Sequence, residues 1–256
     1  MTTVAYEANP VRGPFNAAFF SVMGGYLDWL TRSRKRRVFA DPPDEIVELG
    51  SGVGANFRYF RPGTRVIAVE PNPAMHARLR ARAARHNLEL ELRDAVGEHL
   101  DLPDASTDMV VSSLVLCTVS DPAQVIAEVH RVLRPGGRYA FVEHVGAKDR
   151  PVLRTIQRLV RRPWAWVFEG CSCERDLAGV IANAGFASVE MEAYCVHSPV
   201  LPFNTHVAGI AAKQTTVSCQ QAGPGLAAGQ RRDRRADPTS WMRCALGSPF
   251  PCDPAS

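Results

Sequence analysis

The stretch VELGSGVGAN (47–56) decides the fold, because three glycines at alternate positions, Gly50, Gly52 and Gly54, directly follow a short apolar segment. Residues 45–50 have the length of a buried strand, and the glycines predict a tight loop that opens a helical stretch. Glycines here let the backbone pass close to a ligand with its N–H groups free to donate. Gly50, Gly52 and Ala55 also satisfy the dinucleotide fingerprint, so this loop alone does not separate a nicotinamide cofactor from other nucleotides.

Strand-like and helical segments alternate around this loop. We expect strands at 45–50, 66–70, 88–95, 109–117, 138–145, 188–196 and 206–213, and helices at 14–40, 73–86, 123–133 and 176–186. The apolar run 109–117 is typical of a central parallel strand. The pattern predicts an α/β fold: a mostly parallel central sheet with helices on both faces, in which the last two strands form an antiparallel edge.

Composition limits the class of protein. The 256 residues are 46% hydrophobic and 22% charged, as in a soluble globular protein. No run of about 18 apolar residues is present, so we expect no transmembrane segment and a cytoplasmic location. The net charge of +4 is too small to predict a nucleic-acid partner. The seven cysteines are an odd number, which favours reduced thiols, and Cys171 and Cys173 lack a second pair at zinc-ribbon spacing, so no metal is expected.

We divide the chain into three parts. Residues 1–40 form a helical region that contributes to an acceptor pocket, residues 41–213 form the catalytic domain, and residues 214–256, rich in Pro, Gly, Ala and Arg, form a disordered tail. The sequence leaves the oligomeric state open.

Later motifs separate the candidate cofactors. Glu70 ends the second strand, twenty residues after Gly50, where a carboxylate can accept both hydroxyls of a ribose; the bland alternative is a solvated glutamate. The third strand leads into AVGEHLDLPDASTD (95–108), and the helix at 123–133 ends in RVLRPGG (131–137). Over residues 40–212 this combination resembles the class I S-adenosylmethionine-dependent methyltransferases. The resemblance implies a Rossmann-like fold and S-adenosyl-L-methionine as cofactor.

A closer resemblance rests on further motifs. GSGVGANF (50–57), PNP (71–73), LVLC (114–117), EHV (143–145), Gly170-Cys171 and AGF (184–186) are similar to the methyltransferase-like 7 subfamily, whose members are associated with methylation of small alkyl thiols. The composition suggests a bacterial relative. The family fold implies that the methionine part of the cofactor lies on the glycine loop and the adenosine beside the next strands. The residues implied are Glu48, Gly50, Gly52, Gly54 and Asn56 at the loop, Glu70, Pro71 and Met75 at the ribose and adenosine, Val96, Gly97 and Glu98 at the adenine, and Leu114, whose carbonyl faces the ammonium group.

The acceptor side is less determined by the sequence. His144 follows the fifth strand, where ligands bind in such sheets, so it is our candidate base; a structural histidine is the alternative. Glu143 either orients His144 or faces the other side of the strand. Phe19, Cys117, Trp166 and Cys171 are candidate pocket residues. The segment 158–168 mixes arginines with aromatics, which suits an ordinary amphipathic helix, a lid over an apolar acceptor, or a peripheral membrane contact.

These observations predict an enzyme that transfers a methyl group from S-adenosylmethionine to a small or lipophilic acceptor, with an alkyl thiol as the leading candidate. A lipid headgroup amine and a quinol or secondary-metabolite oxygen are the alternative acceptors. Two other classes stay open: a non-catalytic cofactor-binding partner protein and a nicotinamide oxidoreductase. The LPDASTD and RPGG segments argue against the oxidoreductase.

Overall fold

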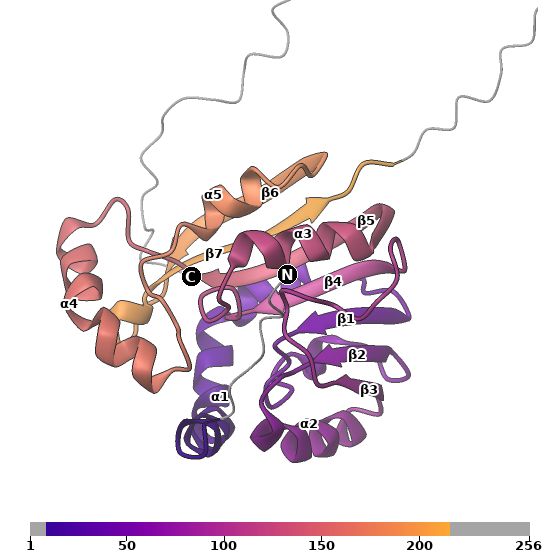
Figure 1. Cartoon of the computed structure of the whole chain (residues 1–256), viewed down its shortest axis with the longest axis horizontal. Coiled ribbons are helices and arrows are strands. Elements are labelled where there is room, and N and C mark those ends of the chain that lie inside the picture. Colours follow the sequence, from indigo (N-terminus) through magenta and orange to yellow (C-terminus); the bar gives the residue numbers. More distant parts are fainter. Residues whose placement is uncertain (1–8, 216–256) are drawn as a thin grey trace, which may run out of the picture. The chain divides into compact units, whose positions relative to one another are not determined.

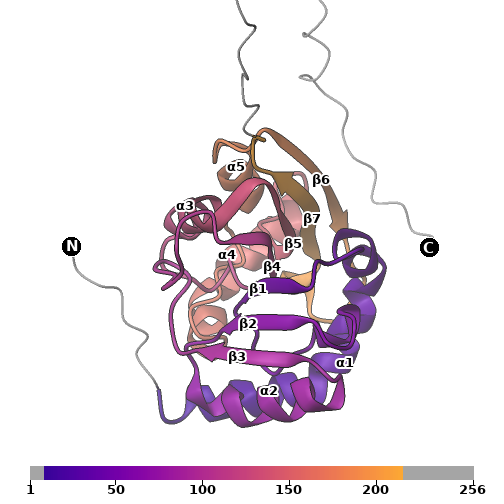
Figure 2. The ribbon, with the colours of Figure 1, turned by 90° about the vertical axis from the view of Figure 1, so that its right-hand side faces the viewer.

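The computed structural model describes residues 9–215. The strands are β1 (Glu45–Leu49), β2 (Arg65–Val69), β3 (Glu89–Arg93), β4 (Thr107–Ser113), β5 (Leu133–His144), β6 (Ser188–Cys195) and β7 (Thr205–Ala212). They form one sheet in the order β3-β2-β1-β4-β5-β7-β6, visible from bottom to top in Figure 2. β1 to β5 are parallel, and β7 runs antiparallel to both β5 and β6. The predicted sheet is confirmed, including its antiparallel edge.

Helices cover both faces of this sheet. The helices are α1 (Arg12–Val38), α2 (Pro73–Arg85), α3 (Pro122–Val132), α4 (Pro151–Val167) and α5 (Leu177–Ala182), with 3₁₀ turns at Phe57–Tyr59 and Leu201–Phe203. α1 and α2 bury apolar residues on one face, and α3 and α5 on the other, where they cross in front of the sheet in Figure 1. The architecture is that of a Rossmann-like fold.

Two helix starts at the ligand-binding edge follow from local sequence. Asn72 caps α2 by accepting from the Ala74 N–H, and Asp121 caps α3 by accepting from the N–H groups of Ala123 and Gln124. In both helices a proline occupies the next position, where its missing N–H costs nothing. These caps fix where the loops after β2 and β4 end.

Two expectations about local structure are wrong. The apolar run 109–117 was expected to be one strand, but β4 ends at Ser113, and Leu114 has a φ of 62°. The Glu143 carboxylate accepts the N–H groups of Val115 and Leu116, so these groups leave the sheet ladder. The glycine loop was expected to open a helical stretch, but only turns and the short 3₁₀ helix Phe57–Tyr59 follow it.

The predicted tail lies outside the described residues except for its first two positions. Within residues 9–215, no helix is long and apolar enough to cross a membrane.

Candidate active site

The glycine loop joins β1 to the edge where the parallel strands end. Gly50 has a φ of 53°, and a Cβ atom there would lie 2.5 Å from Cγ2 of Val115, so no other residue fits. Gly52 also has a positive φ, of 54°, but its Cβ would meet nothing closer than the Gly50 carbonyl at 3.9 Å. At Gly50 the glycine loop therefore packs tightly against the loop that follows β4. At Gly52 it leaves free space, which is where a ligand can approach the backbone.

Buried polar atoms without partners lie under this loop. Glu48 is fully buried at the end of β1, and its Oε1 accepts from Nδ2 of Asn56 at 2.8 Å. Among the described residues, Glu48 Oε2 and Asn56 Oδ1 have no hydrogen-bond partner. Burial raises the pKa of Glu48 to about 7. Two unpaired acceptors are costly in a buried site, so the residues present fit a ligand that brings N–H donors, such as the ammonium group of S-adenosylmethionine.

Glu70 connects the glycine loop to the start of α2. Its Oε2 accepts from the Gly52 N–H at 2.7 Å and its Oε1 from the Asn72 N–H at 2.9 Å. It is 6% exposed, and burial raises its pKa. Each carboxylate oxygen has a further lone pair, so the group retains the capacity to accept ribose hydroxyls. The solvated-glutamate alternative does not hold, because the side chain is buried.

The remaining predicted cofactor residues are distributed along the same edge. Met75 is buried and packs with Ala17 of α1 and Val53 of the loop, while Pro71, Val96 and Gly97 are half-buried. Glu98 is also buried, but its Oε1 accepts from the N–H groups of Ser120 and Asp121. The structure therefore gives Glu98 a role in holding the start of α3.

Glu143 and His144 point to opposite faces of β5, as consecutive strand residues do. Glu143 accepts from Oγ of Ser112 at 2.6 Å and from the N–H groups of Val115 and Leu116 at 2.9 and 3.0 Å. Burial raises its pKa to about 8. Of the two predicted roles, orienting His144 or facing away from it, the structure shows the second. Glu143 positions the loop that carries Leu114 and Cys117, and the sequence analysis assigned it no such role.

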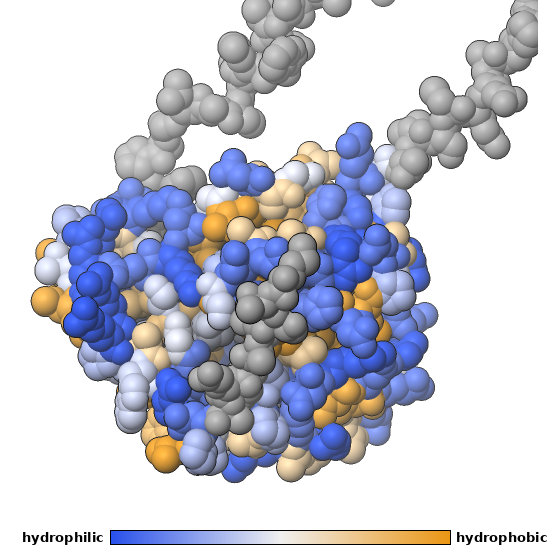
Figure 3. All heavy atoms as spheres, in the orientation of Figure 1, coloured by the Kyte–Doolittle hydropathy of each residue, from blue (hydrophilic) through white to orange (hydrophobic). Residues whose placement is uncertain are grey.

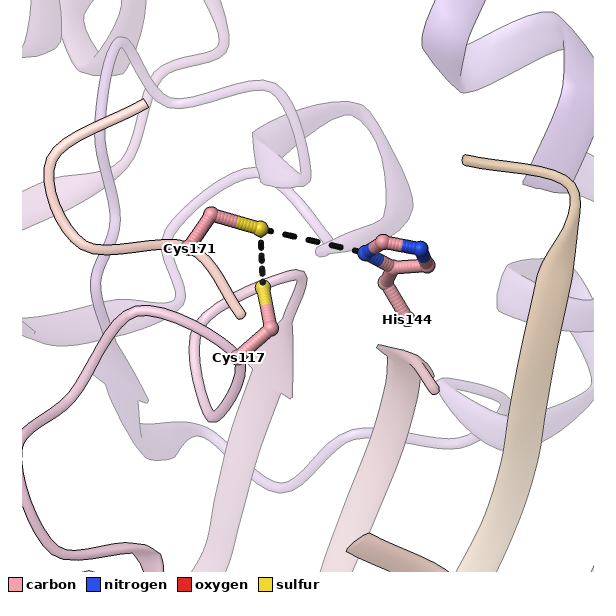
Figure 4. A group of neighbouring side chains, drawn as sticks. All are labelled: Cys117, His144 and Cys171. Atoms are coloured by element: carbon pink, nitrogen blue, oxygen red, sulfur yellow. Dashed lines mark hydrogen bonds between the residues drawn. The ribbon is translucent and has the colours of Figure 1, made fainter. Parts of the chain in front are cut away.

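His144 lies in a buried group with two cysteines (Figure 4). Its Nε2 is 2.7 Å from the Pro202 carbonyl oxygen, which can only accept, so the proton is on Nε2 and Nδ1 is the basic nitrogen. Nδ1 is 3.8 Å from Sγ of Cys171, and that sulfur is 3.4 Å from Sγ of Cys117. The hydrogen bond between the sulfurs lowers the pKa of Cys171 and raises the pKa of Cys117.

The acceptor side differs from the prediction in one aromatic residue. Trp164 donates from Nε1 to Sγ of Cys171 at 3.2 Å and packs on Phe168, whose ring also meets Phe19 of α1. Trp166 is 64% exposed and is not brought into this group. The helical period of α4 carries the missing signal: Gln157, Val160 and Trp164 share its inner face, and Trp166 lies outside it.

Comparisons with known proteins agree with this fold. The methyltransferase domain family matches residues 47–141. The chain is 36% identical over 192 residues to the thiol S-methyltransferase TMT1B of Rattus norvegicus, which covers 71% of this chain and 79% of that protein. It is 33% identical over 171 residues to TMT1A of Homo sapiens, covering 62% and 70%. A Haloferax volcanii methyltransferase, solved with the Trm112 activator, shares the fold with a TM-score of 0.61 and 18% identity, covering 81% of this chain and 100% of that one.

The fold and the site define a class I S-adenosylmethionine-dependent methyltransferase, for which S-adenosylmethionine is the methyl donor. Within that class the chain belongs to the family of the proteins TMT1A and TMT1B. It is an enzyme that methylates a small acceptor. The nicotinamide alternative is thereby set aside.

Proposed function

We propose that this enzyme transfers the methyl group to the sulfur of a small alkyl thiol. One observation carries the proposal: a buried group of two cysteines and one histidine lies at the carboxyl ends of β4 and β5. Cys117 is in the loop that starts at Leu114, His144 ends β5, and Cys171 follows α4. Polarisable sulfur atoms and a basic nitrogen make a suitable environment for a thiol acceptor. The 36% identical relative is a thiol S-methyltransferase, which supports the same acceptor class.

The bound cofactor supplies a methyl group on a sulfonium, which is already activated for transfer. The chain's own task is to bind, to align and to exclude water. Glu48 and Asn56 offer unpaired acceptors under the glycine loop, and Glu70 offers its remaining lone pairs at the end of β2. Alignment of two reactants in a dry site supplies up to about 7–11 kcal/mol of the acceleration.

Helices α1 and α4 close the acceptor side. Nδ2 of Asn16 on α1 donates to the Val167 carbonyl at the end of α4, at 2.9 Å. The ring of Phe19 lies 5.4 Å from that of Phe168, centroid to centroid. This contact between the first helix and the segment before Cys171 supports the assignment of residues 1–40 to the acceptor pocket.

Ionisation of the acceptor depends on His144. A thiol with a pKa of about 8.5 is only a few per cent ionised at neutral pH, so its proton must be removed or its thiolate stabilised. His144 is 1% exposed, and its Nδ1 is the basic nitrogen that faces the two cysteines. Loss of this nitrogen should reduce turnover and leave cofactor binding intact.

The test is methyl transfer from labelled S-adenosylmethionine to three acceptors: an alkyl thiol, phosphatidylethanolamine vesicles and a quinol. Cofactor affinity is measured in the same samples, and Glu70→Gln, which keeps the shape of the carboxylate, is the matched variant. Turnover on the thiol, weakened with cofactor affinity in Glu70→Gln, supports the proposal. Turnover only on the lipid amine or the quinol replaces the thiol. Cofactor binding without turnover on any acceptor favours a binding partner protein instead.

We also propose that α4 touches an anionic membrane surface from the cytoplasmic side. Val152, Leu159 and Trp166 are spaced seven apart on its outer face and are 74%, 76% and 64% exposed. Figure 3 shows apolar side chains at the surface over α4, among hydrophilic ones. Arg162 on the same helix is exposed and complements anionic headgroups, while Arg158 and Arg161 share the charge of Glu174 at 3.5 and 3.9 Å.

A further inference from the structure

The group of Cys117, His144 and Cys171 has the composition and spacing of a metal site. One ligand atom from each residue lies within 4.8 Å of the other two, and all three residues are buried. Zn–S bonds of about 2.3 Å at a tetrahedral angle place two sulfurs about 3.8 Å apart. The observed separation of the two sulfurs is 3.4 Å, and that between Cys171 Sγ and His144 Nδ1 is 3.8 Å. Shifts of a few tenths of an ångström would bring these two pairs to tetrahedral spacing, and the third pair, Cys117 Sγ and His144 Nδ1, lies within 4.8 Å.

The residues behind these atoms are placed as supports for metal ligands. His144 hydrogen-bonds the Pro202 carbonyl through Nε2, which leaves Nδ1 unprotonated and pointing at the sulfurs. A metal-bound histidine in most proteins donates its other N–H to just such an acceptor. Trp164 donates to Sγ of Cys171 at 3.2 Å, which stabilises a thiolate there. The Glu143 carboxylate fixes the backbone just before Cys117 through Val115 and Leu116.

Together these contacts hold the three ligand atoms in place without a disulfide. Cys117 and Cys171 come from loops that are 54 residues apart, and both are free thiols. Cys173, whose Sγ contacts the Gln157 carbonyl, is not part of the group. Of the two cysteines in the C-x-C pair, only Cys171 therefore belongs to the group, and Cys173 does not.

We propose that Cys117, Cys171 and His144 bind a soft divalent cation, with Zn²⁺ as the type, and that its fourth position faces the acceptor pocket. Two thiolates and a neutral imidazole are a donor set that zinc prefers, and catalytic zinc sites keep three protein ligands and one open position. Binding displaces the protons of the two cysteine thiols to solvent.

The second half of this proposal rests on the proposed function, because it makes the acceptor thiol the fourth ligand. On coordination the thiol releases its proton to solvent, and the sulfur becomes a thiolate at neutral pH. That sulfur then forms the bond to the methyl carbon as the bond from carbon to the cofactor's sulfonium breaks. The products are a methyl thioether and S-adenosylhomocysteine, and the neutral thioether is the weaker ligand and leaves. When the metal is bound, His144 is one of its ligands. Ionisation of the acceptor thiol then depends on His144 because His144 helps to hold the metal.

The first experiment titrates the reduced full-length chain with Co²⁺, whose visible spectrum reports tetrahedral geometry and thiolate ligation. We expect one Co²⁺ per chain with a sulfur-to-cobalt charge-transfer band that Zn²⁺ abolishes. Cys117→Ser, Cys171→Ser and His144→Ala should each weaken binding at least tenfold. Cys173→Ser is the matched control and should behave as the wild type. A charge-transfer band of wild-type intensity and wild-type Co²⁺ affinity in both Cys117→Ser and Cys171→Ser overturns the proposal.

A second measurement needs no variant and therefore does not depend on whether the variants fold. X-ray absorption at the zinc edge of the loaded wild-type chain should show two sulfur ligands at about 2.3 Å and one histidine nitrogen at about 2.0–2.1 Å. A shell of only nitrogen and oxygen ligands contradicts the site. Failure of Zn²⁺ to bind at micromolar concentration does so as well.

Activity separates this inference from the proposed function. Thiol methylation that is lost on chelation and restored by Zn²⁺ supports both. Thiol methylation that is unchanged in chelated protein keeps the proposed function and overturns the role of the metal in activating the acceptor. Zinc bound by these three residues, without methylation of any thiol, keeps the metal site and overturns the thiol assignment.

Discussion

Glu143 offers a sharp test of how the active-site loop is held. Its carboxylate is fully buried and accepts three hydrogen bonds, from Ser112, Val115 and Leu116. In Glu143→Gln the amide oxygen can accept the two backbone N–H groups. The new amide can donate to Oγ of Ser112, which then donates to the Tyr139 hydroxyl 2.7 Å away. The substitution therefore keeps the bonds and removes a buried ionisable group.

The magnitude follows from the pKa of Glu143, which burial raises from 4.5 to about 8. Between these values the folded chain keeps a proton that the unfolded chain has released, so this group's contribution to stability is lost as pH rises toward 8. At 1.36 kcal/mol per pKa unit the full loss is about 5 kcal/mol. Glu143→Gln does not titrate. As pH rises over this range, the unfolding free energy of Glu143→Gln should therefore increase relative to that of the wild type by up to about 5 kcal/mol.

The assay is denaturant unfolding of wild type and Glu143→Gln at intervals between pH 5 and 9, with Glu143→Ala as the contrast. Removing the acceptor altogether leaves the N–H groups of Val115 and Leu116 unpaired in a dry site, which should cost about 3 kcal/mol or more relative to Glu143→Gln at every pH. A difference between wild type and Glu143→Gln that does not change with pH would refute the reasoning. So would a Glu143→Ala variant as stable as Glu143→Gln.

Other substitutions test the site more directly. Glu70→Ala should weaken S-adenosylmethionine binding by roughly 10- to 100-fold in calorimetry, since bonds to a charged group are lost; unchanged affinity would remove Glu70 from the cofactor site. Gly50→Ala should abolish cofactor binding, because its Cβ would lie 2.5 Å from Val115, whereas Gly25→Ala, on α1 with open space around it, should bind normally. Trp164→Phe should lower kcat on a thiol several-fold with little change in cofactor affinity, while Trp166→Phe should leave kcat as it is; equal effects would contradict the placement of Trp164. Leu159→Ser combined with Trp166→Ser should reduce sedimentation with anionic vesicles and leave neutral vesicles unaffected, and identical sedimentation would argue against the α4 surface.

Much of the fold could be predicted from local pattern alone. The apolar runs of β1, β2 and β5 are local signals and gave the right elements. The caps at Asn72 and Asp121 are local signals too, although the sequence analysis did not use them. The end of β4 could not be predicted this way. Residues 114–117 are as apolar as the strand before them, and what ends the strand is the carboxylate of Glu143, 28 residues further along the chain from Val115.

The same reason limits the prediction of the site. The glycine loop, Glu48 and Glu70 are close in sequence to the strands that position them, so their placement at one edge follows from the fold. The group of Cys117, His144 and Cys171 depends on contacts between the end of strand β5 and two separate loops. Its two cysteines, Cys117 and Cys171, are 54 residues apart in the sequence. The distinction between Trp164 and Trp166 was available from the helical period, but only once α4 was known to begin at Pro151.

The central claim is methyl transfer to a thiol that depends on His144. The most direct measurement follows transfer from labelled S-adenosylmethionine to an alkyl thiol at saturating cofactor, with the thioether product identified by mass, for wild type and His144→Ala. We predict a labelled thioether from the wild type and a turnover about 10²- to 10⁴-fold lower in His144→Ala, with cofactor affinity unchanged. Equal turnover in the two proteins, or no labelled thioether from a wild type that binds the cofactor, would contradict the claim.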